Sequence, residues 1–175
     1  MLELPGAERI TTAALAARLE ASEAALYRHF ASKAQMFEGL IDFIEHSVFS
    51  LVNQITSRTD TPTSTLQASR IVTMVLQFAE KNPGMTRVMV GDALVFEHER
   101  LQQRMNLFFD KIESNLKQSL RDSAVTADAA TLNALAQVQA SVLTAFMVGR
   151  LQRFARSGFK RLPSEHLEAS LALML

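Results

Sequence analysis

Apolar residues along this chain recur at the spacing of an α-helix, and no stretch alternates with period two over the length of a β-strand. Glycine and proline are few, six and four in 175 residues. Those that act as breaks fall at Pro5-Gly6, Pro62, Pro83-Gly84, Gly158 and Pro163. The sequence therefore predicts an all-α fold.

The breaks divide the chain into a series of expected helices. Two short helices come first, and a long helix with Ser32 as its N-cap follows them. The polar run Thr56–Thr65 predicts a loop, and Pro62 suits a helix start because its missing N–H is not needed there. The expected helices cover about 11–19, 22–29, 32–55, 62–81, 84–94, 97–122, 127–157 and a piece from 163.

The two short helices have the layout of a DNA-reading helix-turn-helix. An alanine-rich helix, a turn of about three residues and a second short helix that begins at a serine are typical of that motif. We expect four apolar side chains to hold the pair together: Leu15, Leu19, Leu26 and Phe30. The spacing alone leaves a second interpretation open, an ordinary helical hairpin with two capped helices.

A specific motif favours the first interpretation. Ile10-Thr-Thr, Leu15-Ala, Ser22 and Ala25-Leu-Tyr-Arg-His-Phe-Ala-Ser-Lys33 resemble the N-terminal domain of TetR-family transcription factors. The resemblance implies that five side chains contact backbone phosphates: Thr11, Ser22, Tyr27, His29 and Lys33. It also implies that the outward face of residues 23–27 reads bases, with Ala24 and Tyr27 best placed.

The predicted DNA-binding head, residues 1–33, and the residues next to it depart from the family pattern in three ways. Glu20-Ala21 stand where the family usually has Gly-Val, so a left-handed glycine is lost and we expect a strained turn. The family's basic first helix is represented here only by what looks like its final turn, residues 1–6. Residues 1–46 hold four basic and seven acidic side chains, which is a poor balance for a phosphate-binding surface. Either the start is truncated or misassigned, or the head folds without that helix. We therefore expect weak DNA binding by the chain as written and DNA binding by the full-length protein, and a helical interaction module that does not bind DNA remains an alternative.

The long helix after the head has one apolar stripe, at positions 36, 37, 40, 41, 44, 48, 51, 52 and 55. Phe43 and Phe49 fall off this stripe. Either they pack on a neighbouring helix, or they form an exposed aromatic anchor for a protein partner. The expected domain boundary lies just before this helix, with a DNA-binding head over 1–33 and a linker, dimerisation and partner-binding domain over 34–175.

Segments over nearly the whole chain resemble one branch of the TetR family, which acts in nucleoid occlusion. Among them are Met36–Glu45, Asn82–Arg87, Gly91–Glu97 and Gly149–Ser157. The resemblance implies a DNA-bound, dimeric inhibitor of cell division that antagonises polymers of the division GTPase FtsZ. Five positions match the FtsZ-facing surface: Phe43, Met74, Gln77, Lys81 and Asn82. Leu51 stands where an arginine is expected, and the Thr56–Thr65 loop looks longer.

Two later helices carry apolar stripes that predict a four-helix dimer bundle, with a purely intramolecular core as the alternative. The first stripe comprises Leu101, Met105, Phe108, Ile112, Leu116 and Leu120. The second comprises Leu132, Leu135, Val142, Leu143, Phe146 and Leu151, interleaved with alanines. A basic cluster follows at Arg150, Arg153, Arg156, Lys160 and Arg161, which we interpret as a solvated face at a helix C-terminus or a contact for a membrane or acidic partner.

Composition excludes several classes of function. The chain has no cysteine, so disulfides and thiolate chemistry are ruled out. It shows no secretion signal and no run long enough for a membrane span, so we expect a cytoplasmic, nucleoid-associated protein. Its four histidines are scattered, and we find no catalytic constellation, metal site or cofactor motif. The runner-up function is a ligand-responsive TetR-type repressor, which requires a closed apolar pocket of roughly several hundred Å³.

Overall fold

The structure is a computed structural model that describes residues 2–3, 11–20, 22–57, 63–121 and 129–175. These residues form helices joined by turns, in agreement with the predicted all-α fold. The α-helices are α1 (Thr12–Arg18), α2 (Glu23–His29), α3 (Lys33–Thr56), α4 (Ser64–Lys81), α5 (Pro83–Met89), α6 (Glu99–Arg121), α7 (Ala129–Arg156) and α8 (Leu167–Met174), and η1 (Asp92–Leu94) is a 3₁₀ turn.

Side-chain hydroxyls begin the first four helices, since each accepts a hydrogen bond from a backbone N–H three residues on. The caps are Thr11, Ser22, Ser32 and Thr63, and Ser32 is the cap that the sequence predicted. The fourth helix begins at Ser64 rather than at Pro62, which lies outside the described residues. The predicted helix ends at 122 and 127 also lie outside them.

The single helix expected over 84–94 is wrong. α5 ends at Met89, Gly91 adopts a left-handed φ of 78°, and a separate 3₁₀ turn follows. Glycine takes this conformation without the Cβ penalty of other residues, which lets the chain turn there. The turn buries Leu94 and brings the Asp92 carboxylate within 2.8 Å of the Arg87 guanidinium.

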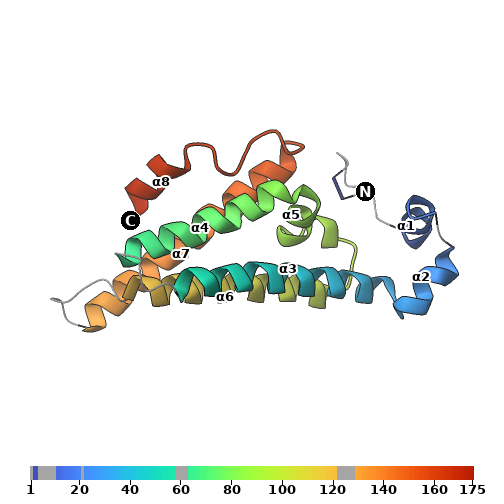
Figure 1. The fold of residues 1–175 in the computed structure, drawn as a ribbon, viewed down its shortest axis with the longest axis horizontal. Helices are drawn as coiled ribbons and strands as arrows, with labels where there is room; N and C mark the ends of the chain where they lie inside the picture. Colours follow the sequence, from blue (N-terminus) through green and yellow to red (C-terminus); the bar gives the residue numbers. More distant parts are fainter. Residues whose placement is uncertain (1, 4–10, 21, 58–62, 122–128) are drawn as a thin grey trace.

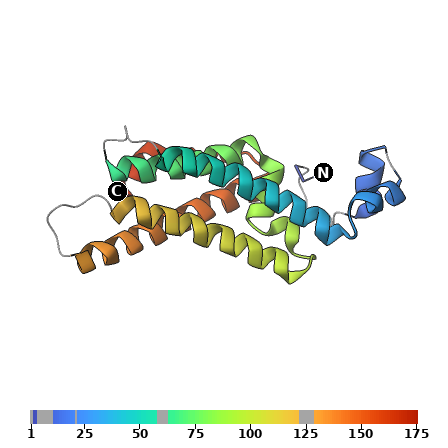
Figure 2. The ribbon, with the colours of Figure 1, turned by 60° about the horizontal axis from the view of Figure 1, so that its bottom comes forward.

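The core lies among α3, α4, α6 and α7, which pack lengthwise, while the head of α1 and α2 projects at one end (Figures 1 and 2). Every predicted stripe residue of α6 is buried. On α3 the stripe is buried at Phe37, Ile41, Ile44, Val48 and Val52, whereas Leu51 is exposed. The apolar face of α3 therefore anchors the linker in the C-terminal domain.

Three sets of ion pairs join α3 to the start of α6 and its preceding turn. Lys33 pairs with Glu97, Arg100 lies 2.8 Å from Glu38, and Arg104 binds both Asp42 (2.7 Å) and Glu45 (2.8 Å). Exposed pairs contribute little to stability, but these pairs fix the rotation of α3 against α6. They thereby set the direction in which the remaining face of the linker helix points.

Candidate nucleic-acid interface and partner surface

The head presents a polar face built by its two short helices. The hydroxyls of Thr11 and Ser22 each lie 3.1 Å from the N–H that they cap, at Ala14 and Ala25. Both hydroxyls lie at helix N-termini, where N–H groups and the helix dipole favour phosphate oxygens. The side chain of Thr12 donates to Glu23 at 2.7 Å and ties the two helices together. This geometry suits backbone contacts to a nucleic acid.

The predicted reading face of α2 is open to solvent. Ala24, Tyr27 and His29 are all exposed, and 47% of the Tyr27 surface remains accessible. Their arrangement on a short helix after a capped turn matches an element that enters the major groove. Contact of these residues with bases or phosphates stays a prediction.

The turn between α1 and α2 carries the strain that the sequence predicted. Glu20 adopts a φ of 52°, in the left-handed region where a side chain is disfavoured. No glycine relieves the strain at this position, because the chain has Glu20 where the family pattern has glycine. The strain costs about 1 kcal/mol and lies next to the helix that would read DNA.

Lys33 does not lie free on the polar face of the head. Its ammonium group pairs with the carboxylate of Glu97, and the two side chains are only 17% and 10% exposed. The same ammonium lies 5.7 Å from the centre of the Phe37 ring. A phosphate contact by Lys33, which remains a prediction, would therefore have to compete with a carboxylate of the C-terminal domain. Sequence reasoning missed this pairing because Glu97 is 64 residues away.

The apolar side of the head is only partly covered. Leu19 is 63% exposed, so the expectation that it helps bind the two helices together is wrong. It lines an apolar groove of about 600 Å³ between the head, α3 and α5. The other predicted head-core residues line the same groove: Leu15, Leu26 and Phe30. α1 and α2 are too short to bury these side chains by their mutual contact alone.

The two phenylalanines that fall off the α3 stripe have different environments. Phe49 packs edge-on against the buried ring of Phe108, with ring centres 5.5 Å apart. Phe43 is 54% exposed. Asp42 and Glu45, on either side of Phe43 in sequence, both bind Arg104 and orient that part of α3. Burial lowers the pKa of Arg104, but hydrogen bonds and attraction from the two carboxylates outweigh this effect and leave the pKa raised. Arg104 therefore stays charged, and we call its contacts with Asp42 and Glu45 the Arg104 clamp.

The other predicted partner residues lie on α4 and at its end. Met74, Gln77 and Lys81 follow the three- and four-residue spacing of one helix face. Met74 packs against the core, whereas Gln77 and Lys81 are exposed. Asn82 caps the end of α4, since its side-chain amide donates to the Phe78 carbonyl at 2.7 Å. Lys81 and Asn82 also line the groove that faces the head. Binding of a partner here remains a prediction.

α7 has two apolar faces. One packs into the core through Ala136, Ala140, Leu143, Met147 and Leu151. The other is an exposed seam of Leu135, Val138 and Val142 that continues through Ala145 and Gly149, with alternating steps of three and four residues. That alternation is the heptad spacing of helices that pair lengthwise. The stripe predicted for α7 included Leu135 and Val142 but not Val138, because the mixture of two apolar faces obscures the period.

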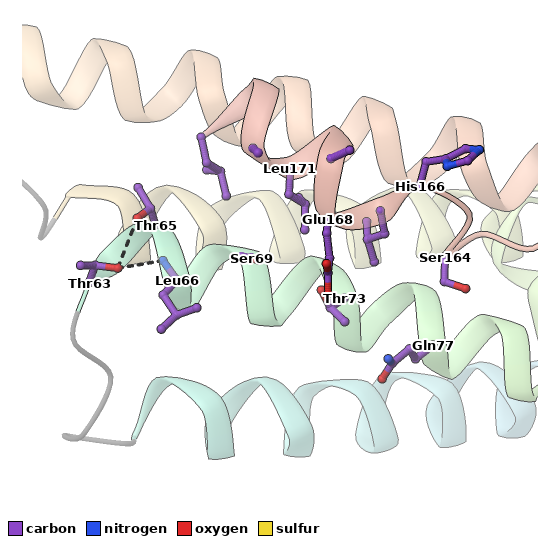
Figure 3. Close-up of a pocket in the computed structure, with 14 residues that line it drawn as sticks. Thr63, Thr65, Leu66, Ser69, Thr73, Gln77, Ser164, His166, Glu168 and Leu171 are labelled. Atoms are coloured by element: carbon purple, nitrogen blue, oxygen red, sulfur yellow. Dashed lines mark hydrogen bonds between the residues drawn. The ribbon is translucent and has the colours of Figure 1, made fainter.

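A second hollow lies between α4 and α8 (Figure 3). It measures about 940 Å³, is open to solvent and is lined by both polar and apolar side chains, among them Ser69, Thr73, Ser164 and Leu171. Ser164 donates to Glu80 at 2.6 Å and ties the start of the α8 segment to α4. This groove differs from the closed apolar pocket that a ligand-responsive repressor requires.

α7 also bears on the prediction of no membrane span. By length and composition alone, residues Ala130–Arg156 could cross a membrane. One face of the helix packs into the protein core, and another carries exposed apolar residues at heptad spacing; together these two faces account for the apolar composition. The absence of a span therefore remains a prediction.

Within the described part of the chain, no group of three or more acidic or histidine side chains is placed to hold a metal ion.

Comparisons with known proteins agree with this architecture. Residues 1–40 match the bacterial regulatory proteins of the tetR family, and residues 63–175 match the SlmA-like, Tetracyclin repressor-like C-terminal domain. The nucleoid occlusion factor SlmA of Idiomarina loihiensis is 48% identical over 174 residues, 99% of this chain and 87% of that protein. SlmA of Vibrio vulnificus is 47% identical over 170 residues, 97% of this chain and 85% of that protein. The chain belongs to the SlmA family of nucleoid occlusion factors.

SlmA proteins are TetR-type DNA-binding regulators rather than enzymes, as the sequence predicted for this chain. A solved structure supports the fold independently. The transcriptional regulator FadR of Bacillus subtilis, determined in complex with stearoyl-CoA, superposes with a TM-score of 0.69. The superposition covers 97% of this chain and 89% of that one at 11% identity, so it establishes the shared TetR-type fold alone.

Proposed function

We propose that this SlmA-family protein acts as a dimer bound to chromosomal DNA and inhibits division by antagonising FtsZ polymers. In this proposal the head reads DNA, α7 forms the dimer, and the faces of α3 and α4 contact FtsZ. The protein would then be held at the nucleoid. The observation that carries the partner contact is the exposure of Phe43 on a helix whose apolar stripe is largely buried.

The dimer is supported by the second face of α7. Leu135, Val138 and Val142 are 54%, 60% and 47% exposed, and Leu107 on α6 is also exposed. Exposed apolar residues at heptad spacing on a long helix favour burial against another helix. A two-fold axis along this seam would present two heads to the two halves of a palindromic site.

The partner contact is supported by the way in which the molecule fixes Phe43. The Arg104 clamp holds α3 so that Asp42 and Glu45 face α6 while Phe43 remains exposed. Exposed aromatic residues on rigid elements are the usual anchors of protein interfaces. Gln77 and Lys81 on α4 supply polar groups for the rim of such an interface.

The test is sedimentation of FtsZ polymers in the presence of GTP, with and without this protein and a palindromic DNA. We expect the protein to reduce pelleted FtsZ, more strongly with DNA, and Phe43→Ala to abolish the reduction. Phe96→Ala is the matched control, because Phe96 is 64% exposed but lies in the turn before α6. Unchanged pelleting by a protein that is demonstrably bound to DNA would refute the division role.

A further inference from the structure

We propose that a basic turn at the C-terminal end of α7 contacts DNA phosphates without regard to sequence, in addition to the head. The basic turn consists of four cationic side chains: Arg153, Arg156, Lys160 and Arg161. All four are exposed. In the described part of the chain none of them makes an ion pair.

The distribution of charge makes this turn unusual in the molecule. The chain as a whole is neutral, with 18 basic and 18 acidic residues. Residues 150–161 hold five basic residues, the four of the turn and Arg150, and no acidic residue. The head, residues 1–33, by contrast holds four basic and four acidic side chains and so has no excess of positive charge. Phosphate binding requires lysine and arginine, so the head alone is poorly supplied for a nucleic-acid partner.

The backbone holds the basic turn in a fixed shape. Gly158 and Phe159 both adopt left-handed conformations, with φ of 63° and 64°. The N–H of Phe159 donates to the Phe154 carbonyl at 2.9 Å, and the two rings pack edge-on with their centres 5.1 Å apart. The hydroxyl of Ser157 accepts from the N–H groups of the next two cationic residues at 3.1 and 2.9 Å. The backbone that carries Lys160 and Arg161 is thus fixed before a ligand arrives, which lowers the entropy cost of binding.

Neutralisation of the helix dipole does not account for all four cations. Arg153 and Arg156 lie in the last turn of α7, where positive charge is favourable. Lys160 and Arg161 lie beyond the helix, and Ser157 and Phe159 already satisfy the Phe154 carbonyl. Arg156 lines a groove that also includes two acidic residues, Asp92 and Asp110. The least compensated charges are therefore those of Lys160 and Arg161.

The position of the turn favours DNA as the partner. The C-terminal end of α7 lies beside α5, at the end of the helical domain nearer to the head (Figures 1 and 2). A duplex held by the head therefore approaches this end of the molecule. The phosphates could belong to that duplex or to a second one, and the chemistry of the contact is the same in both cases.

The test measures how DNA affinity falls with salt, using full-length protein, fluorescence anisotropy and a duplex of unrelated sequence much longer than one site. Each lost phosphate contact reduces the slope of log K against log salt by about 0.9, so Lys160→Gln/Arg161→Gln should reduce it by about 2 per protomer. Lys117→Gln/Arg121→Gln is the control, with the same charge change at the far end of α6. It should leave the slope unchanged.

Repeating the series in a Tyr27→Ala background separates this proposal from the function of the head. In that background Lys160→Gln/Arg161→Gln should still reduce the slope of log K against log salt, even if the head does not read DNA as proposed. Capture of a labelled duplex by a protein already bound to an immobilised duplex would assign the phosphates to a second DNA segment, and a loss of slope without capture would assign them to the same segment. An unchanged salt slope in Lys160→Gln/Arg161→Gln would overturn the proposal. It would also be overturned if this variant kept its DNA binding but lost binding to phosphatidylglycerol vesicles, because the basic turn would then contact a membrane.

Discussion

The head and the helical domain differ in how completely they bury their apolar residues. In the helical domain, α6 alone buries seven residues, and Phe108 is fully inaccessible. In the head, α2 buries no residue, and among the described residues of α1 only Ala16 is buried. The helical domain therefore supplies the stability of the molecule, and the head depends on its junction with α3 for its position.

The largest expected difference between the two regions is in the free energy of unfolding that is lost when a large apolar side chain is truncated. We expect Phe108→Ala to lower the free energy of unfolding by about 3–5 kcal/mol, because it leaves a cavity beneath Phe49. Leu26→Ala in the head should cost far less, because Leu26 already borders an open groove. Urea unfolding followed by circular dichroism measures both. Equal losses would show that the head belongs to the same cooperative core.

The helical domain leaves an apolar face exposed along α7. Val142→Asp should weaken the dimer by about 3 kcal/mol, because it would bury an unpaired charge at the helix pair. Leu162→Asp is the matched control, since both residues are 47% exposed but Leu162 lies outside α7. Sedimentation velocity over a concentration series should show monomer for the first variant and dimer for the second. A dimer that survives Val142→Asp would place the interface elsewhere.

The junction of the two regions rests partly on the ion pair between Lys33 and Glu97. Glu97→Gln removes the carboxylate and leaves the largely buried Lys33 ammonium without its ionic partner, which should cost about 1–2 kcal/mol locally. We expect faster hydrogen exchange over residues 23–37 and little change in α6 and α7. Asp110→Gln, an exposed acidic position on α6, is the control. Unchanged exchange at the head would mean that α3 packing alone fixes its position.

The smallest expected effect is a gain in stability within the head itself. Glu20→Gly should stabilise the turn between α1 and α2 by about 0.5–1 kcal/mol, since glycine adopts positive φ without strain. Glu20→Ala separates conformation from charge, because it removes the carboxylate without relieving the backbone. Hydrogen exchange of α1 and α2 should slow in the glycine variant alone. An equal gain in the alanine variant would attribute the effect to charge.

Local signals predicted most of the fold. The α6 stripe is buried at every predicted position, and the Ser32 cap begins α3 as expected, because both depend only on residues near in sequence. The break at Gly91 was missed, since a glycine within a helical pattern is often tolerated.

The site was less predictable because its details depend on distant residues. Nothing local distinguishes Phe43 from Phe49; contacts with Phe108 and Lys111 on α6 partly bury Phe49, whereas Phe43 remains exposed. In the same way, Glu97 decides the environment of Lys33. Motifs predicted which residues belong to the site, and long-range packing determined which of them remain accessible.

The central claim is that the head binds DNA while a separate surface on α3 and α4 binds FtsZ. It is tested most directly by measuring the affinities of Tyr27→Ala and Phe43→Ala for a palindromic duplex and for FtsZ, each by fluorescence anisotropy. We predict that Tyr27→Ala binds the palindromic duplex much more weakly and keeps FtsZ binding, and that Phe43→Ala loses FtsZ binding and keeps its affinity for the duplex. Loss of both activities in either variant, or of neither in Phe43→Ala, would contradict the separation of the two surfaces.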